Sequence, residues 1–111
     1  MQNEIEVNGA ETTGAYVIVR CRNAGVHAGH LEGRDENVLR LTNNRRLWRW
    51  WSKFTLSELA MTGILKGKES ECKFACTLPK LELTASDVCE VIPCTEEAMK
   101  SILAIADHSN E

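Results

Sequence analysis

The segment AYVIVRC, residues 15–21, decides the fold class because it reads as a β-strand. β-Branched and aromatic side chains, which favour strands, fill its centre. RNAG at residues 22–25 predicts a turn, and VHAGHLEG at residues 26–33 returns as the second strand of a hairpin. Gly25 and Gly29 predict a bulge or a close backbone approach in that second strand.

Apolar and polar residues continue to alternate after a polar turn. VLRLT at residues 38–42 predicts a third strand and RRLWRWW at residues 45–51 a fourth, with a turn at Asn43 and Asn44 between them.

A further group of short strands is predicted after residue 71. In CKFACTL, residues 72–78, the alternation predicts one shared face for Cys72, Phe74, Cys76 and Leu78. Pro79 ends this strand or marks a sheet edge. LELT and DVCEVI, within residues 81–92, supply one or two more strands.

Two short helices are predicted among the strands. Thr55 and Glu58 match a capping box, and Gly63 can end that helix. Thr95 caps a second helix, EEAMKSILAIA, after Pro93 stops the last strand. The pattern predicts an α+β fold: a mostly antiparallel curved sheet or small barrel of about six strands, with a short mid-chain helix and a C-terminal helix.

Length and composition favour one globular domain, which we place at residues 15–106. The polar, acidic residues 1–14 read as a flexible arm without signal-peptide character, and residues 107–111 as a frayed tail. No apolar run approaches the roughly 18 residues of a membrane span. Five cysteines without a signal peptide predict free thiols in a reducing compartment such as the cytoplasm.

The charge distribution favours a bounded anionic partner. The net charge of −3 argues against a protein that coats nucleic acid. Residues 40–53 nevertheless carry Arg40, Arg45, Arg46, Arg49 and Lys53, with no acidic residue among them.

The Arg/Trp segment, residues 45–51, holds all three tryptophans of the chain. On a strand, Arg46, Trp48 and Trp50 share one face, whereas Arg45, Leu47, Arg49 and Trp51 share the other. Indole rings stack on flat ligands, and guanidinium groups bind phosphate. The alternative is that part of the segment belongs to the core and the arginines are solvated. Because three tryptophans are hard to bury in a small domain, we expect at least one to be exposed.

Histidines, cysteines and known motifs give little support for metal binding or catalysis. His27 and His30 are three residues apart and point to opposite faces of a strand, and the cysteine spacings do not match zinc knuckles. No GxSxG, HExxH or P-loop pattern occurs. We therefore expect no enzyme, no cofactor and no metal. His27, between two glycines, and Arg20 complete the candidate ligand-binding set with Arg45, Arg46, Trp48, Trp50 and Trp51.

Four segments in order, YVIVRCRNAGVHAGHL, RRLWRWW, TLSELAMTGI and EVIPCTEEAMKSI, resemble a family of small uncharacterised phage and prophage proteins. The resemblance covers roughly residues 16–103, and AGVH and RRLW are its most distinctive parts. The chain departs from the family pattern at residues 21–23, where an aromatic residue is common, and at Trp51, where a smaller or polar residue is usual. The resemblance implies a viral origin and supplies no activity.

Three functions follow as hypotheses. The first is a non-enzymatic, homo-oligomeric binding protein that sequesters an anionic ligand, for instance a nucleotide defence signal, or a host protein through the Arg/Trp segment. The second is a virion or assembly component that uses the segment as a subunit contact. The third is a nucleic-acid accessory protein.

Overall fold

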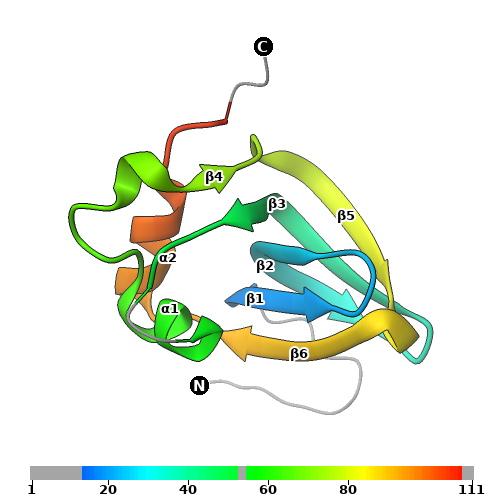
Figure 1. The fold of residues 1–111 in the computed structure, drawn as a ribbon. Coiled ribbons are helices and arrows are strands. Elements are labelled where there is room, and N and C mark those ends of the chain that lie inside the picture. The colour runs from blue at the N-terminus through cyan, green and yellow to red at the C-terminus, as the bar shows by residue number, and fades with distance from the viewer. Residues whose placement is uncertain (1–13, 53–54, 109–111) are drawn as a thin grey trace.

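The fold is a curved, mostly antiparallel sheet with two helices on one side (Figure 1). The computed structural model describes residues 14–52 and 55–108. The expected arm therefore lies outside the described residues except for Gly14, as does Lys53 of the basic run. No helix among the described residues is long and apolar enough to span a membrane.

The sheet order is β4-β3-β2-β1-β6, and β5 pairs with β3 beside β4. The strands are β1 Tyr16–Cys21, β2 Val26–Arg34, β3 Val38–Arg49, β4 Lys73–Phe74, β5 Leu78–Thr84 and β6 Val88–Pro93. The helices are α1 Leu56–Thr62 and α2 Glu96–Leu103, with 3-10 turns η1 Glu69–Glu71 and η2 Ala85–Asp87. The expected α+β class, mid-chain helix and C-terminal helix are confirmed, and the sheet is a curved, unclosed one.

The predicted turn at Asn43 and Asn44 is wrong, because β3 runs through both residues. Ala28 pairs with Arg45 and His30 pairs with Thr42, so the two asparagines together oppose Gly29. Asn43 has a φ of 47°, which asparagine tolerates better than most residues. A Cβ at position 29 would lie 3.0 Å from the backbone Cα of Asn44, so only glycine fits this bulge.

The strand predicted for residues 72–78 is also divided differently. Only Lys73 and Phe74 pair as β4, and β5 starts at Leu78, before Pro79. Pro79 therefore lies inside an edge strand, which is one of the two alternatives that its position predicted. Cys76 and Leu78 are exposed and do not share the buried face of Phe74.

Both helices begin at the predicted caps. The hydroxyl of Thr55 accepts from the Glu58 amide, and that of Thr95 accepts from the Ala98 amide. Gly63, with a φ of 83°, ends α1 and lies against Ser101 of α2. α2 ends at Leu103, earlier than the predicted residue 106.

Both faces of β1 are covered, which explains why this strand is so apolar. One core packs between the sheet and the helices, and its buried members are Tyr16, Ile18, Ala28, Leu47, Leu59, Ala60, Ile64, Cys72, Phe74, Ile102 and Ile105. The second core fills the concave side, and its buried members are Val17, Val19, Cys21, Leu31, Leu39, Leu41 and Leu83. Successive residues of β1 thus enter opposite cores.

Candidate functional site

Arg45 belongs to the core and not to a ligand surface, which corrects the sequence-based assignment. Its side chain is 2% exposed and lies on the helix side, opposite Ala28. The guanidinium donates to the carbonyls of Ala75, Ile102 and Ile105 at 2.8, 3.1 and 2.8 Å. It also pairs with the Asp107 carboxylate at 3.2 Å. Because carbonyls at a helix C-terminus carry partial negative charge, Arg45 ties the end of α2 to β3.

His27 is likewise buried and does not face a ligand. Its side chain is 6% exposed, and Nε2 donates to the Ala24 carbonyl at 2.8 Å. Nδ1 is buried without a partner among the described residues. Burial, and to a lesser extent the Arg46 cation opposite it on β3, lowers the pKa of His27. The ring is therefore neutral and structural.

Arg46 is exposed and lies across the β1–β2 turn. A Cβ at Gly25 would come within 2.8 Å of Arg46 Nη2, so the glycine leaves the room that this side chain occupies. The φ of Gly25, 90°, is a second reason for glycine there. Among the described residues Arg46 forms no ion pair.

A β-bulge at Trp48 creates an exposed aromatic and basic surface. Leu47 pairs with Phe74 and Arg49 pairs with Lys73, so Trp48 is the extra residue on β3. Trp48 is 50% exposed, and its neighbour Arg49 is exposed too, where a regular strand would bury one of the two. Because Phe74 points into the helix-side core, Lys73 and its partner Arg49 lie on the opposite face.

The C-terminal segment completes this surface. Asp107 bridges Phe74 as a parallel partner, and the His108 amide donates to the Phe74 carbonyl at 2.8 Å. The His108 ring meets the Trp48 ring edge to face, with centroids 5.8 Å apart. Both residues, expected in a frayed tail, are thus held against β4. We call Arg46, Trp48, Arg49, Lys73 and His108 the Trp48 surface.

The remaining candidates lie elsewhere. Trp50 is half-buried and packs against the helix-side core. Trp51 is 39% exposed, and the Nζ of Lys68, a residue of the loop after α1, lies 5.2 Å from its ring centroid. Arg20 pairs with Glu90 at 2.8 Å across β1 and β6, and this hydrogen bond raises the pKa of Arg20. Arg20 is in register with Val26, whose side chain packs on the helix-side core, so Arg20 lies on the helix side of the sheet. Arg46 precedes Leu47, which shares the face of Val26, and therefore lies on the opposite face.

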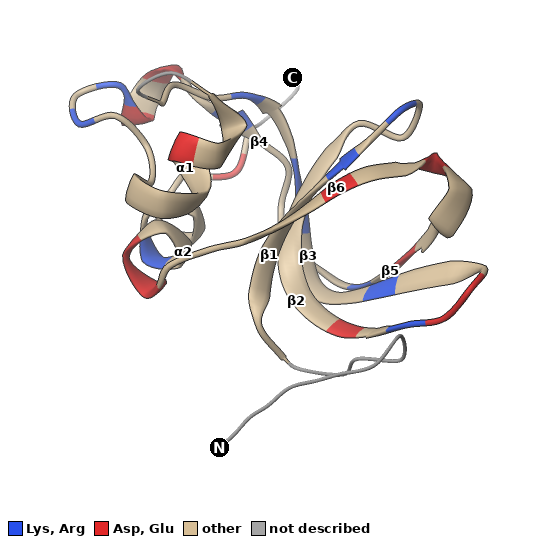
Figure 2. Cartoon of the chain, turned by 90° about the horizontal axis from the view of Figure 1, so that it is seen from below, with Lys and Arg blue, Asp and Glu red and all other residues tan. Residues whose placement is uncertain are grey.

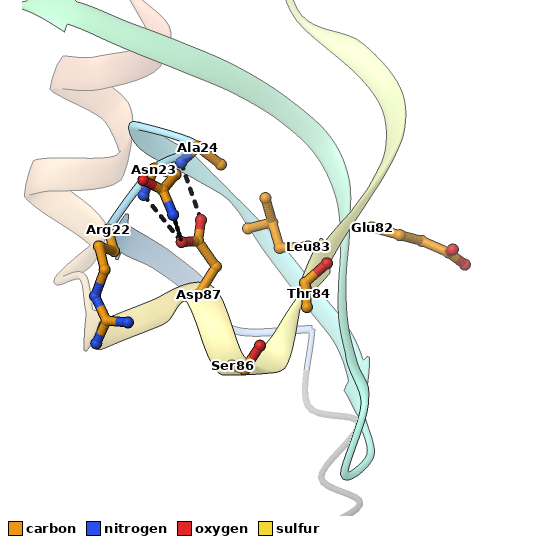
Figure 3. A pocket seen from close by; sticks show the side chains of 8 residues that line it. All are labelled: Arg22, Asn23, Ala24, Glu82, Leu83, Thr84, Ser86 and Asp87. Carbon is orange, nitrogen blue, oxygen red and sulfur yellow. Dashed lines mark hydrogen bonds between the residues drawn. The ribbon is translucent and has the colours of Figure 1, made fainter.

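A polar groove of about 450 Å³ lies where the β1–β2 turn meets η2 (Figure 3). The Asp87 carboxylate accepts from the Asn23 amide, the Asn23 side chain and the Ala24 amide, each at 2.9 Å. Figure 3 shows these bonds joining the two walls, with Glu82 pointing away from the groove. These three hydrogen bonds occupy the Asp87 carboxylate and hold the β1–β2 turn against η2. The groove is therefore a weaker candidate for a ligand site than the Trp48 surface.

Within residues 14–52 and 55–108, no cluster of three histidine, cysteine or acidic side chains is placed to hold a metal ion. All five cysteines are free. Burial raises the pKa of Cys21 and Cys72, and raises that of Cys94 to about 11. These three thiols are therefore protonated at neutral pH and are poor nucleophiles.

Sequence reasoning missed Lys73 and His108 as surface members. The pattern placed Lys73 on a strand, but its pairing with Arg49 depends on register, which local alternation does not fix. His108 had no signal at all, because it reaches Trp48 only through the pairing of Asp107 with β4.

Fold and surface together define a single-domain α+β protein with a basic, aromatic surface at the end of its longest strand. The chain belongs to the family described as Domain of unknown function (DUF6948), which matches residues 14–102. Comparisons with curated proteins and with solved structures found no match.

Proposed function

We propose that this protein is a non-enzymatic binding protein that holds an anionic ligand or protein on the Trp48 surface. The observation that carries the proposal is the pair Arg49 and Lys73, two cations directly opposite each other across β3 and β4. Like charges in that position destabilise a sheet, so an anion that binds both relieves a repulsion present in the free protein.

Several other surface arginines and lysines are neutralised by acidic neighbours, whereas, within the part of the chain that the structure describes, the cations of the Trp48 surface are not. Arg20, Arg40, Lys68 and Lys100 each pair with a nearby carboxylate. Arg46, Arg49 and Lys73 form no such pair among the described residues. Figure 2 shows basic residues on β3 and next to β4, whereas acidic residues colour α1 and the start of α2. The half-exposed Trp48 beside the cations adds apolar area, as in the anchors of binding surfaces.

A symmetric subunit contact through this surface is the less favoured alternative. A two-fold axis would place Arg46, Arg49 and Lys73 against the same cations of a second copy, and that repulsion opposes association. If the protein is a homo-oligomer, as its sequence led us to expect, its subunits meet elsewhere. A long nucleic acid is disfavoured by the net charge of −3.

The proposal includes the setting in which such a protein acts. The resemblance to phage and prophage proteins and the five free thiols favour a viral protein in the cytoplasm of its host. The anion it sequesters there is a nucleotide defence signal or an acidic face of a host protein. Fractionation of infected cells and native mass spectrometry test the location and the subunit number.

A thermal-shift panel tests the binding role. The panel contains inorganic phosphate, mononucleotides, cyclic dinucleotides and an acidic peptide. A ligand at 100 times its Kd should add about 2.7 kcal/mol to the free energy of unfolding. The double variant R49A/K73A should lose the shift.

Lys80→Ala is the matched control. Lys80 is exposed on β5 opposite Thr42, seven residues along β3 from Arg49 and hence about 23 Å away. It removes one positive charge without touching the Trp48 surface and should keep the shift. A flat panel for the unmodified protein would refute the binding role.

A further inference from the structure

We infer that the ligand of the Trp48 surface joins a flat ring to a phosphate group in one small molecule, as a nucleoside monophosphate does. This inference rests on the proposed binding role and narrows it. It follows from which groups are exposed side by side, and from how far the cationic surface extends.

The ring is indicated by the state of Trp48. His108 approaches it edge to face, with an interplanar angle of 86°, and half of the tryptophan remains exposed. A second ring can therefore stack on the uncovered part of the indole. Because Trp48 is the bulge residue, its side chain does not pack in the helix-side core. Trp50 differs, because it is half-buried against that core.

The phosphate is indicated by the two facing cations. Side chains directly opposite in an antiparallel pair have Cβ atoms about 5 Å apart, so one tetrahedral anion can accept from both. Arginine supplies a planar fork of N–H donors that matches phosphate oxygens, and lysine supplies a point charge. A phosphate dianion offsets both positive charges, whereas a single carboxylate offsets one.

One small molecule can supply both the ring and the phosphate because Trp48 and Arg49 are consecutive residues, with Cα atoms about 3.8 Å apart. Along β3 the cations also do not continue as a track. Beyond Arg46, the next arginine back along β3 is the buried Arg45, and Arg40 is neutralised by Asp35 and Glu82. One nucleotide unit therefore suits the surface better than a strand of many phosphates.

Titration calorimetry with three probes tests the inference: 5′-AMP, ribose 5-phosphate and adenosine. Stacking on an aromatic residue is worth about 1–3 kcal/mol per base, so 5′-AMP should bind at least about fivefold more tightly than ribose 5-phosphate. Adenosine, which lacks the anion, should bind at least tenfold more weakly than 5′-AMP. The indole fluorescence should be quenched by 5′-AMP and not by ribose 5-phosphate.

Two variants at one position separate stacking from folding. Trp48→Phe keeps a ring and should retain most of the preference for 5′-AMP, whereas Trp48→Leu should abolish the preference and leave ribose 5-phosphate binding unchanged. Equal binding of 5′-AMP and ribose 5-phosphate would overturn the ring requirement and leave the anion-binding role intact. An oligonucleotide that binds more than tenfold more tightly per site than 5′-AMP would instead identify a strand as the ligand. If no probe and no acidic peptide binds, both proposals fail.

Discussion

Replacing Arg45 by methionine should destabilise the protein severely, because the partners of this arginine remain when its guanidinium is removed. Methionine fills the space of the aliphatic part of arginine and carries no charge, but its side chain ends two atoms short of the terminal guanidinium nitrogens. Three acceptors of the guanidinium are backbone carbonyls, of Ala75, Ile102 and Ile105, and substitution cannot remove them. The variant therefore removes the Arg45 donor from the carbonyls of Ala75 and Ile105, whereas the Ile102 carbonyl keeps the Ile105 amide at 3.3 Å.

The magnitude follows from these partners. A buried acceptor that loses its donor costs about 1–3 kcal/mol. The Asp107 carboxylate is 64% exposed and regains water, so it adds little. Burying the arginine also carried a desolvation cost that methionine avoids. We therefore expect a net loss of about 3–4 kcal/mol, out of a total stability of about 5–15 kcal/mol.

Urea unfolding followed by circular dichroism measures this loss. The midpoint for R45M should fall, with a decrease in melting temperature of more than about 10 °C. The exposed neighbour gives the matched control: R46M should change the free energy of unfolding by less than about 0.5 kcal/mol. If R45M loses less than 1 kcal/mol, the carbonyls do not depend on Arg45 and its assignment as a structural clamp is wrong.

Two further predictions concern the hydrogen-bonded carboxylate of Asp87 and the buried ring of His27. Asp87→Ala removes three hydrogen bonds to a carboxylate and should lower the free energy of unfolding by about 2–4 kcal/mol, measured by urea titration. A loss below 1 kcal/mol would show that these hydrogen bonds are not needed to hold the β1–β2 turn. Burial lowers the pKa of His27 below 6.5, so the unfolded chain protonates this histidine more readily than the folded one. The contribution of His27 to stability is therefore complete above pH 6.5 and decreases as the pH falls below 6.5. His27→Gln, which keeps an N–H donor for Ala24, should flatten stability between pH 7 and 5.5 by up to about 1.4 kcal/mol per pH unit, and an unchanged slope would exclude His27 as its source.

The sequence by itself determined the elements whose signals are local. Thr55, Thr95 and Gly63 place the helix ends, because a cap needs only a side chain and the backbone of the next turn. Alternation found β1 and β2, and the expectation that at least one tryptophan is exposed is confirmed by Trp48. The α+β class follows from the same patterns.

Tertiary structure alone decided which residues of the Arg/Trp segment form a surface. Arg45 and Arg46 have the same hydrophobicity and the same strand propensity, yet Arg45 is buried in the core and Arg46 is exposed to solvent. The difference arises because the acceptors of Arg45 come from residues 57 to 62 positions away as well as from Ala75. Register acts in the same way on Lys73, which meets Arg49 only because a bulge displaces Trp48. Burial of a charge and the pairing of strands depend on partners distant in the chain, and no local pattern records them.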